Sequence, residues 1–233
     1  MKQIKIFGLA LVAMFALVSA AMATSAMAVE VVLPDIHIAL GEAFPVKASG
    51  EIKAEPLAAK LETALKEPII ATSVKAELEA TALVALGPLI LVFKGTKQKT
   101  TECLGEGEAK ETITVKGEYH LLDKLFENKL ALFLLALFPE LKLVCGKLKI
   151  TVIPPAITRI TGVTDMVDTT TFGTQPKCVG AGKQEFTEFE NDAGENKTKQ
   201  LLLANLGLGK ENACEQFEKE LVLTSNKMIE FLF

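Results

Sequence analysis

Apolar residues that recur at every second position constrain this chain more than any other feature of its sequence. In residues 74–82, Val, Ala and Leu alternate with Lys, Glu and Thr. Successive side chains of a β-strand point to opposite faces, so this period predicts a strand with one face against a core and the other in water. The turn signal Gly87-Pro88 then precedes a second, more apolar strand that we expect at 89–93.

The same alternation recurs along the chain, which predicts further strands at 35–40, 112–116, 141–145 and 147–152. Many short strands separated by Gly-rich turns are typical of all-β proteins, and we predict an antiparallel β-sandwich or a barrel-like domain. The parity of the apolar positions switches at Gly146, which predicts a β-bulge there.

Helix is the minority prediction. Residues 56–68 fit either an amphipathic helix or a strand, and the neighbouring strands favour the strand. One short helical turn is expected within 211–221, before the last strand.

Residues 130–138, with the sequence LALFLLALF, form the longest apolar run after the N-terminal region. Nine residues are too few for a membrane-spanning helix, which needs about 18–20. We interpret the run as a buried strand with apolar side chains on both faces; a short core helix is the alternative. A strand with two apolar faces must be covered on both sides, which predicts a central position.

The N-terminus has the pattern of a signal peptide over residues 1–28. Lys2 and Lys5 precede an apolar stretch, and Ala26-Met27-Ala28 fits a signal-peptidase site. An uncleaved transmembrane helix is the alternative. We expect a secreted, extracellular or envelope-associated protein without a transmembrane segment in its mature chain. Residues 29–233 are predicted to form a single all-β domain, with a possible subdomain boundary near 95–110.

Four cysteines, an even number in an exported chain, predict disulfide bonds. Four cysteines allow three pairings, and closure between sequence neighbours favours Cys103–Cys145 with Cys178–Cys214. The spacings contain no close CxxC pair, so a zinc site is disfavoured.

Composition argues against several classes of partner. The formal net charge is −4 and Arg159 is the single arginine, which disfavours nucleic acid. The chain has no Trp and one Tyr, Tyr119, which disfavours a sugar site that stacks on aromatic rings.

No catalytic constellation is evident. Ser49, Ser73 and Ser225 are the serines after residue 28, and none lies in a GxSxG motif; His37 and His120 are isolated. The acidic segments 164–168 and 190–196 do not match an EF-hand, and the second suits a hairpin turn. We expect no enzyme activity, no cofactor and no metal site.

Segments 111–122, 182–197, 201–209 and 223–233 resemble a group of exported proteins from soil actinobacteria. These proteins carry signal peptides, a few cysteines and β-rich mature regions, and the group has no established activity. The resemblance implies a single exported all-β module and assigns no functional residue.

The sequence therefore favours a non-enzymatic exported β-protein that acts by binding or as an envelope or extracellular component, with the cell envelope or a protein as partner. A carrier of a small apolar ligand in a β-barrel is the alternative, because the chain is rich in Leu, Ala and Phe. An atypical secreted hydrolase is a second alternative.

Overall fold

The computed structural model confirms the all-β class. It describes residues 35–38, 43–64, 67–81, 86–126, 129–163, 169–186, 188–190, 197–199, 202–207 and 209–232, and these contain strands and no helix. Within those ranges no helix could cross a membrane. The predicted signal peptide and the acidic segment 164–168 lie outside the described residues.

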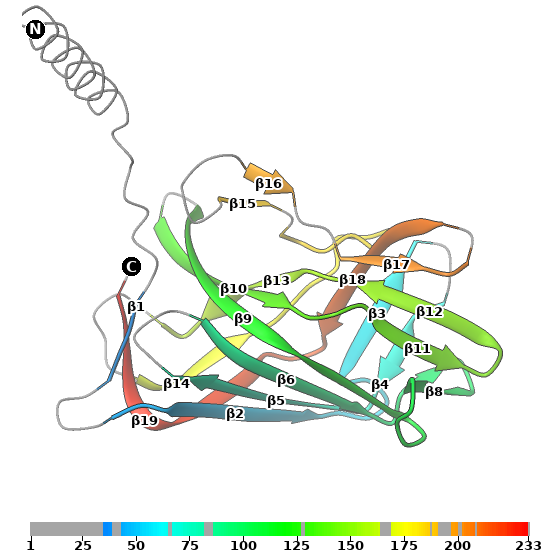
Figure 1. Ribbon diagram of the computed structural model, residues 1–233, viewed down its shortest axis with the longest axis horizontal. Helices are drawn as coiled ribbons and strands as arrows, with labels where there is room; N and C mark the ends of the chain where they lie inside the picture. The colour runs from blue at the N-terminus through cyan, green and yellow to red at the C-terminus, as the bar shows by residue number, and fades with distance from the viewer. Residues whose placement is uncertain are drawn as a thin grey trace, which may run out of the picture.

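A nine-stranded antiparallel sheet forms the larger part of the molecule and closes on itself where β19 pairs with β2 (Figure 1). β1 lies outside this ring and pairs with the C-terminal half of β19. We call this sheet the large barrel. Its strands are β1 (Asp35–Ile38), β2 (Val46–Lys53), β5 (Ser73–Ala80), β6 (Leu86–Lys94), β9 (Thr112–Phe126), β10 (Lys129–Leu137), β13 (Ala156–Thr161), β14 (Thr169–Thr174) and β19 (Leu221–Leu232).

A second closed barrel, the small barrel, lies beside the large one (Figure 1). It consists of four hairpins that pair edge to edge. Its strands are β3 (Ala59–Thr63), β4 (Ile69–Ala71), β7 (Lys97–Gln98), β8 (Thr101–Gly105), β11 (Leu141–Cys145), β12 (Leu148–Ile153), β17 (Leu203–Asn205) and β18 (Lys210–Phe217).

The chain passes repeatedly between the two barrels. β3 and β4 belong to the small barrel, β5 and β6 to the large one, β7 and β8 to the small one again, and the same exchange continues to β19. The connections are short: one residue, Thr72, separates β4 from β5. Neither barrel is therefore a continuous segment of the sequence. The predicted single domain over 29–233 and its boundary near 95–110 stay predictions.

Each barrel has its own core of buried apolar side chains. The large-barrel core is the more extensive and includes Val74, Leu132 and Leu223, each no more than 1% exposed. Phe93 and Phe138 pack against both cores. These shared side chains mark the junction at which the two barrels meet.

β10 confirms the interpretation of the apolar run. Leu132, Leu134 and Ala136 point into the large barrel. Ala131, Phe133 and Leu135 point outward, where Phe186 packs edge-on against Phe133 with ring centroids 4.9 Å apart. A strand has two faces, so complete burial needs a second layer outside the barrel. The segment 175–186, which we call the strap, contributes Phe186 to that layer.

Two local predictions were wrong. Gly146 does not form a bulge but lies in the tight turn between β11 and β12, with φ of 62°. The change of apolar parity arises because the chain reverses there. The helical turn expected in 211–221 is also absent from the described residues, since 210–217 form β18. Pairing with β3 and β17 on its two sides outweighs the helix propensity of its Glu and Gln residues.

Two other predictions are confirmed. Residues 56–68 contain the strand β3 rather than a helix. The segments on either side of 191–196 pair as the hairpin β15 (Glu188–Glu190) and β16 (Lys197–Lys199), although the turn itself lies outside the described residues.

Gly50 allows the large barrel to close. It lies on β2 beside the seam with β19, where a Cβ atom would overlap the Val222 carbonyl oxygen. Glycine in a strand often marks such a close backbone approach.

Candidate functional site

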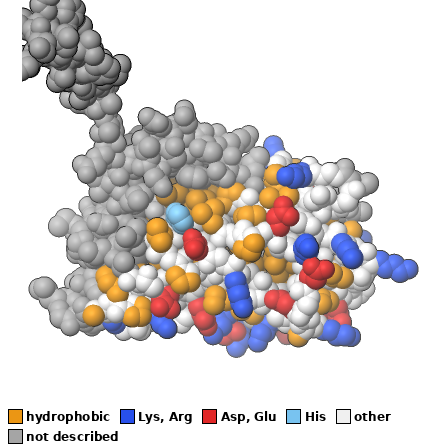
Figure 2. All heavy atoms as spheres, in the orientation of Figure 1, with side chains coloured by type: hydrophobic (Ala, Val, Ile, Leu, Met, Phe, Trp, Pro, Cys, Tyr) orange, Lys and Arg blue, Asp and Glu red, His pale blue; other side chains and the backbone are white. Residues whose placement is uncertain are grey.

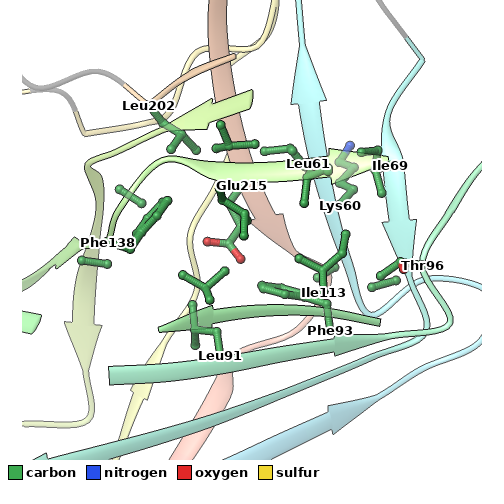
Figure 3. Close-up of a pocket in the computed structure, with 18 of the residues that line it drawn as sticks. Lys60, Leu61, Ile69, Leu91, Phe93, Thr96, Ile113, Phe138, Leu202 and Glu215 are labelled. Carbon is green, nitrogen blue, oxygen red and sulfur yellow. The ribbon is translucent and has the colours of Figure 1, made fainter. Parts of the chain in front are cut away.

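A pocket lies at the junction of the two barrels. Its walls are mostly apolar side chains from β3, β4, β6, β9, β10, β11, β12 and β13, together with Phe138 and Leu202 (Figure 3). We call it the junction pocket. Its volume is about 70 Å³. The pocket exists because strands of two barrels with separate cores diverge here, and large side chains such as Phe93 and Phe138 only partly fill the space.

β18 supplies the one carboxyl group in this wall. Ala213 and Phe217 on this strand are buried in the barrel cores, and Cys214 between them forms a disulfide on the opposite face. Because side chains alternate along a strand, Glu215 faces the interior with Ala213 and Phe217. A carboxyl group thus occupies an inward-facing position of β18, where the neighbouring inward-facing side chains are apolar.

The other two polar residues that line the junction pocket already have partners. The Lys60 ammonium group lies 2.5 Å from a Glu62 carboxylate oxygen. The Thr96 hydroxyl donates a hydrogen bond of 2.6 Å to the carbonyl oxygen of Cys103. Neither group needs a ligand to satisfy it.

The Glu215 carboxyl group has no hydrogen bond or ion pair with any residue that the structure describes. It points into the junction pocket toward Leu91 and away from the Lys60 ammonium (Figure 3). Glu215 is partly accessible, and it lines the junction pocket. Burial raises the pKa of Glu215 to about 7, because the charged carboxylate loses its hydration.

A second pocket adjoins the first on the large-barrel side. It has a volume of about 50 Å³ and shares Leu91, Ala136, Ala156 and Glu215 with the junction pocket. Pro176, Lys177 and Gln184 of the strap form part of its wall. Glu215 therefore borders both spaces.

The disulfides match the pairing predicted from the sequence. Cys103 and Cys145 lie opposite each other on β8 and β11, within the small-barrel core. Cys178–Cys214 attaches the strap to β18, one residue before Glu215. Glu62 lies near the second disulfide, but both sulfurs are used in the S–S bond and are not available as thiolate ligands.

The serines and the described histidine do not converge. Ser49 is exposed on β2, and Ser225 is buried on β19. His120 lies on β9, which β5 and β6 separate from β2, a distance of roughly 14 Å across the sheet. The side chain of His37 lies outside the described residues, and Arg159 is exposed on β13.

A surface hollow of about 240 Å³ lies over the outer faces of β2, β5 and β6. Most of its charged side chains have partners: Lys75 lies 2.5 Å from Glu77, and the Ser73 hydroxyl donates a hydrogen bond to Glu51. Lys94, the other charged residue of the hollow, is exposed to water. Figure 2 shows acidic and basic side chains interspersed over the visible face. This hollow is a solvated strand face without an unpaired group of the kind that Glu215 presents.

Glu215 was not among the predicted site residues, because residues 211–221 were expected to hold a helical turn. The signal was present in the alternation of Ala213, Glu215 and Phe217, which places a carboxyl group on the apolar side of a strand. No local sequence pattern predicts the pocket itself, because its lining residues come from strands that are far apart in the chain.

No protein-family model, curated protein or solved structure matches the chain. The function is therefore inferred from the geometry of the junction pocket and from the compartment that the disulfides suggest.

Proposed function

We propose that this protein is an exported, non-enzymatic binding protein that holds a small apolar molecule in the junction pocket. The proposal combines the export expected from the sequence with the carrier function considered there as an alternative. Two disulfides support an oxidising, extracellular environment. Association with the cell envelope is compatible with this function.

The junction pocket is the observation that carries the proposal. Small-molecule sites are typically concave and mostly apolar, with a small number of polar groups that orient the ligand. This pocket fits that description: its walls are apolar, and its one unpartnered polar group among the described residues points inward. The junction pocket and the second pocket both border Glu215, so the ligand is expected where the two barrels meet.

The experiment has two parts. Protein purified from a secreting host is examined by native mass spectrometry for a co-purified small molecule. Binding of a fluorescent apolar dye is then compared between the wild type and Ala136→Leu. Ala136 borders both pockets, so the added side chain occupies the ligand space and should weaken dye binding at least tenfold.

Ala109→Leu is the matched control, because Ala109 is exposed in the turn before β9. It should leave dye binding unchanged. Circular dichroism verifies that both variants are folded. Equal dye affinity in Ala136→Leu and the wild type, with no co-purified molecule, contradicts the proposed function.

A further inference from the structure

We propose that the junction pocket selects a small apolar molecule bearing one protonated amine, whose ammonium group pairs with the Glu215 carboxylate. The inference rests on the proposed binding function and specifies the chemical class of its ligand.

A bound ligand changes the environment of the Glu215 carboxyl group. A wholly apolar ligand would displace water from the pocket and leave the carboxyl group buried without a partner, which is unfavourable. An ammonium group supplies both the opposite charge and hydrogen-bond donors. In such a poorly hydrated site, an ion pair with good geometry is stronger than in water.

The other charges around the pocket also favour a cationic ligand. Lys60 on β3 is held by Glu62, and Lys177 is exposed at the strap. The lining residues that β4, β6, β9, β11 and β12 contribute to the junction pocket carry no charge. No described cation thus neutralises Glu215, and an ionised carboxylate ligand would be repelled. The net charge of −4 also favours the approach of cations.

The volumes of about 70 and 50 Å³ suit a molecule with only a few carbon atoms. Butylamine is therefore the probe, with 1-butanol as its neutral analogue and butyrate as its anionic analogue. An alkyl amine, like a lysine side chain with a pKa of about 10.4, is protonated at pH 8. Isothermal titration calorimetry at pH 8 measures the three affinities on the full-length exported protein.

We expect butylamine to bind at least tenfold more tightly than 1-butanol, and butyrate to bind least. Glu215→Gln should bring the affinities for butylamine and 1-butanol to within about twofold. Glu218→Gln makes the same chemical change at an exposed residue just after β18 and should keep the wild-type preference.

A pH series on the wild type provides a test that does not depend on a variant folding. Affinity for butylamine should rise at least fivefold between pH 5 and pH 8 as the carboxyl group ionises, while affinity for 1-butanol changes little. An affinity for butylamine that is independent of pH overturns the inference.

The outcomes separate this inference from the proposed function. If 1-butanol binds as tightly as butylamine, the ligand class is wrong and the binding function stands. If butyrate binds best, the ligand class is again wrong. If none of the three binds and Ala136→Leu leaves dye binding unchanged, both proposals fail.

Discussion

At the scale of single residues, Glu215 places a carboxyl group without a described partner among apolar side chains. Its neighbours on the inner face of β18 are apolar, and its carboxyl group has no partner among the described residues. Proteins seldom bury a carboxylate without a partner, because the cost of desolvation is high. A group of this kind is often kept for a function.

The pH dependence of stability tests the burial of Glu215. Burial raises its pKa from 4.5 to about 7 in the folded protein, so the folded state holds a proton that the unfolded state has released. The contribution of Glu215 to the free energy of unfolding is therefore greatest below pH 4.5, decreases as the pH rises toward 7 and is lost above pH 7. The change is on the order of 3 kcal/mol.

Glu215→Gln removes this dependence. The stability of the variant relative to the wild type should therefore rise by up to about 3 kcal/mol between pH 4 and pH 8, as measured by urea unfolding. Comparison with Glu218→Gln corrects for the general effect of removing an acid. A constant difference across this pH range would show that the carboxyl group is hydrated in the folded state.

At the scale of elements, β10 and the strap depend on each other. Phe186 of the strap packs against Phe133 and helps to cover the outer face of β10. The disulfide to Cys214 holds the strap, and the strap also forms part of the wall of the second pocket. The Cys178–Cys214 disulfide therefore helps to hold both the cover over the outer face of β10 and the wall of the second pocket.

Truncation on either face of β10 should be costly. Phe133→Ala is expected to lower the free energy of unfolding by about 3–5 kcal/mol, and Leu132→Ala by about 2–5 kcal/mol, since both side chains are buried. Val222→Ala, at a half-exposed position of β19, should cost less than about 0.5 kcal/mol. Chemical denaturation measures all three. A small loss for Phe133→Ala would mean that the outer face of β10 is in contact with water.

Loss of the strap disulfide should act both globally and locally. The Cys178–Cys214 disulfide closes a loop of 36 residues. The free energy of unfolding of the double variant Cys178→Ser with Cys214→Ser should therefore be lower by about 3–4 kcal/mol. Trypsin under native conditions should also cleave faster after the exposed residues Lys177 and Lys183.

The matched comparison is Cys103→Ser with Cys145→Ser, which opens a loop of 42 residues inside the small-barrel core. Its stability loss should be at least as large, since two hydroxyl groups enter an apolar core, but early cleavage in the strap should not occur. Equal cleavage of the strap in the two double variants would argue against a specific role of Cys178–Cys214 in holding it.

At the scale of the whole molecule, the interleaved chain joins the two barrels into one structure. Each barrel takes strands from the beginning, middle and end of the described chain. Phe93 and Phe138 contribute to both cores. Neither barrel can therefore form completely without the strands that lead into and out of the other.

Thermal unfolding should consequently show one cooperative transition. Differential scanning calorimetry is expected to give a calorimetric enthalpy close to the van't Hoff enthalpy. Phe138→Ala, which removes a side chain common to both cores, should lower the transition temperature without splitting the peak. Two resolved peaks in the wild type would show that the barrels unfold separately.

The alternation of apolar residues was sufficient to predict the all-β class and several of the strands, because strand periodicity is a local property. The unbroken apolar run at 130–138 predicted the burial of β10 on both faces. The pairing of Cys103 with Cys145 and of Cys178 with Cys214 also followed from simple closure between sequence neighbours. The turn at Gly146 and strand β18 were predicted incorrectly, since chain reversal and pairing with distant strands override local propensity. Tertiary structure alone decided the division into two barrels and the pocket between them. Glu215 gained its distinctive environment in the same way, because a carboxyl group loses its water only when side chains distant in sequence surround it.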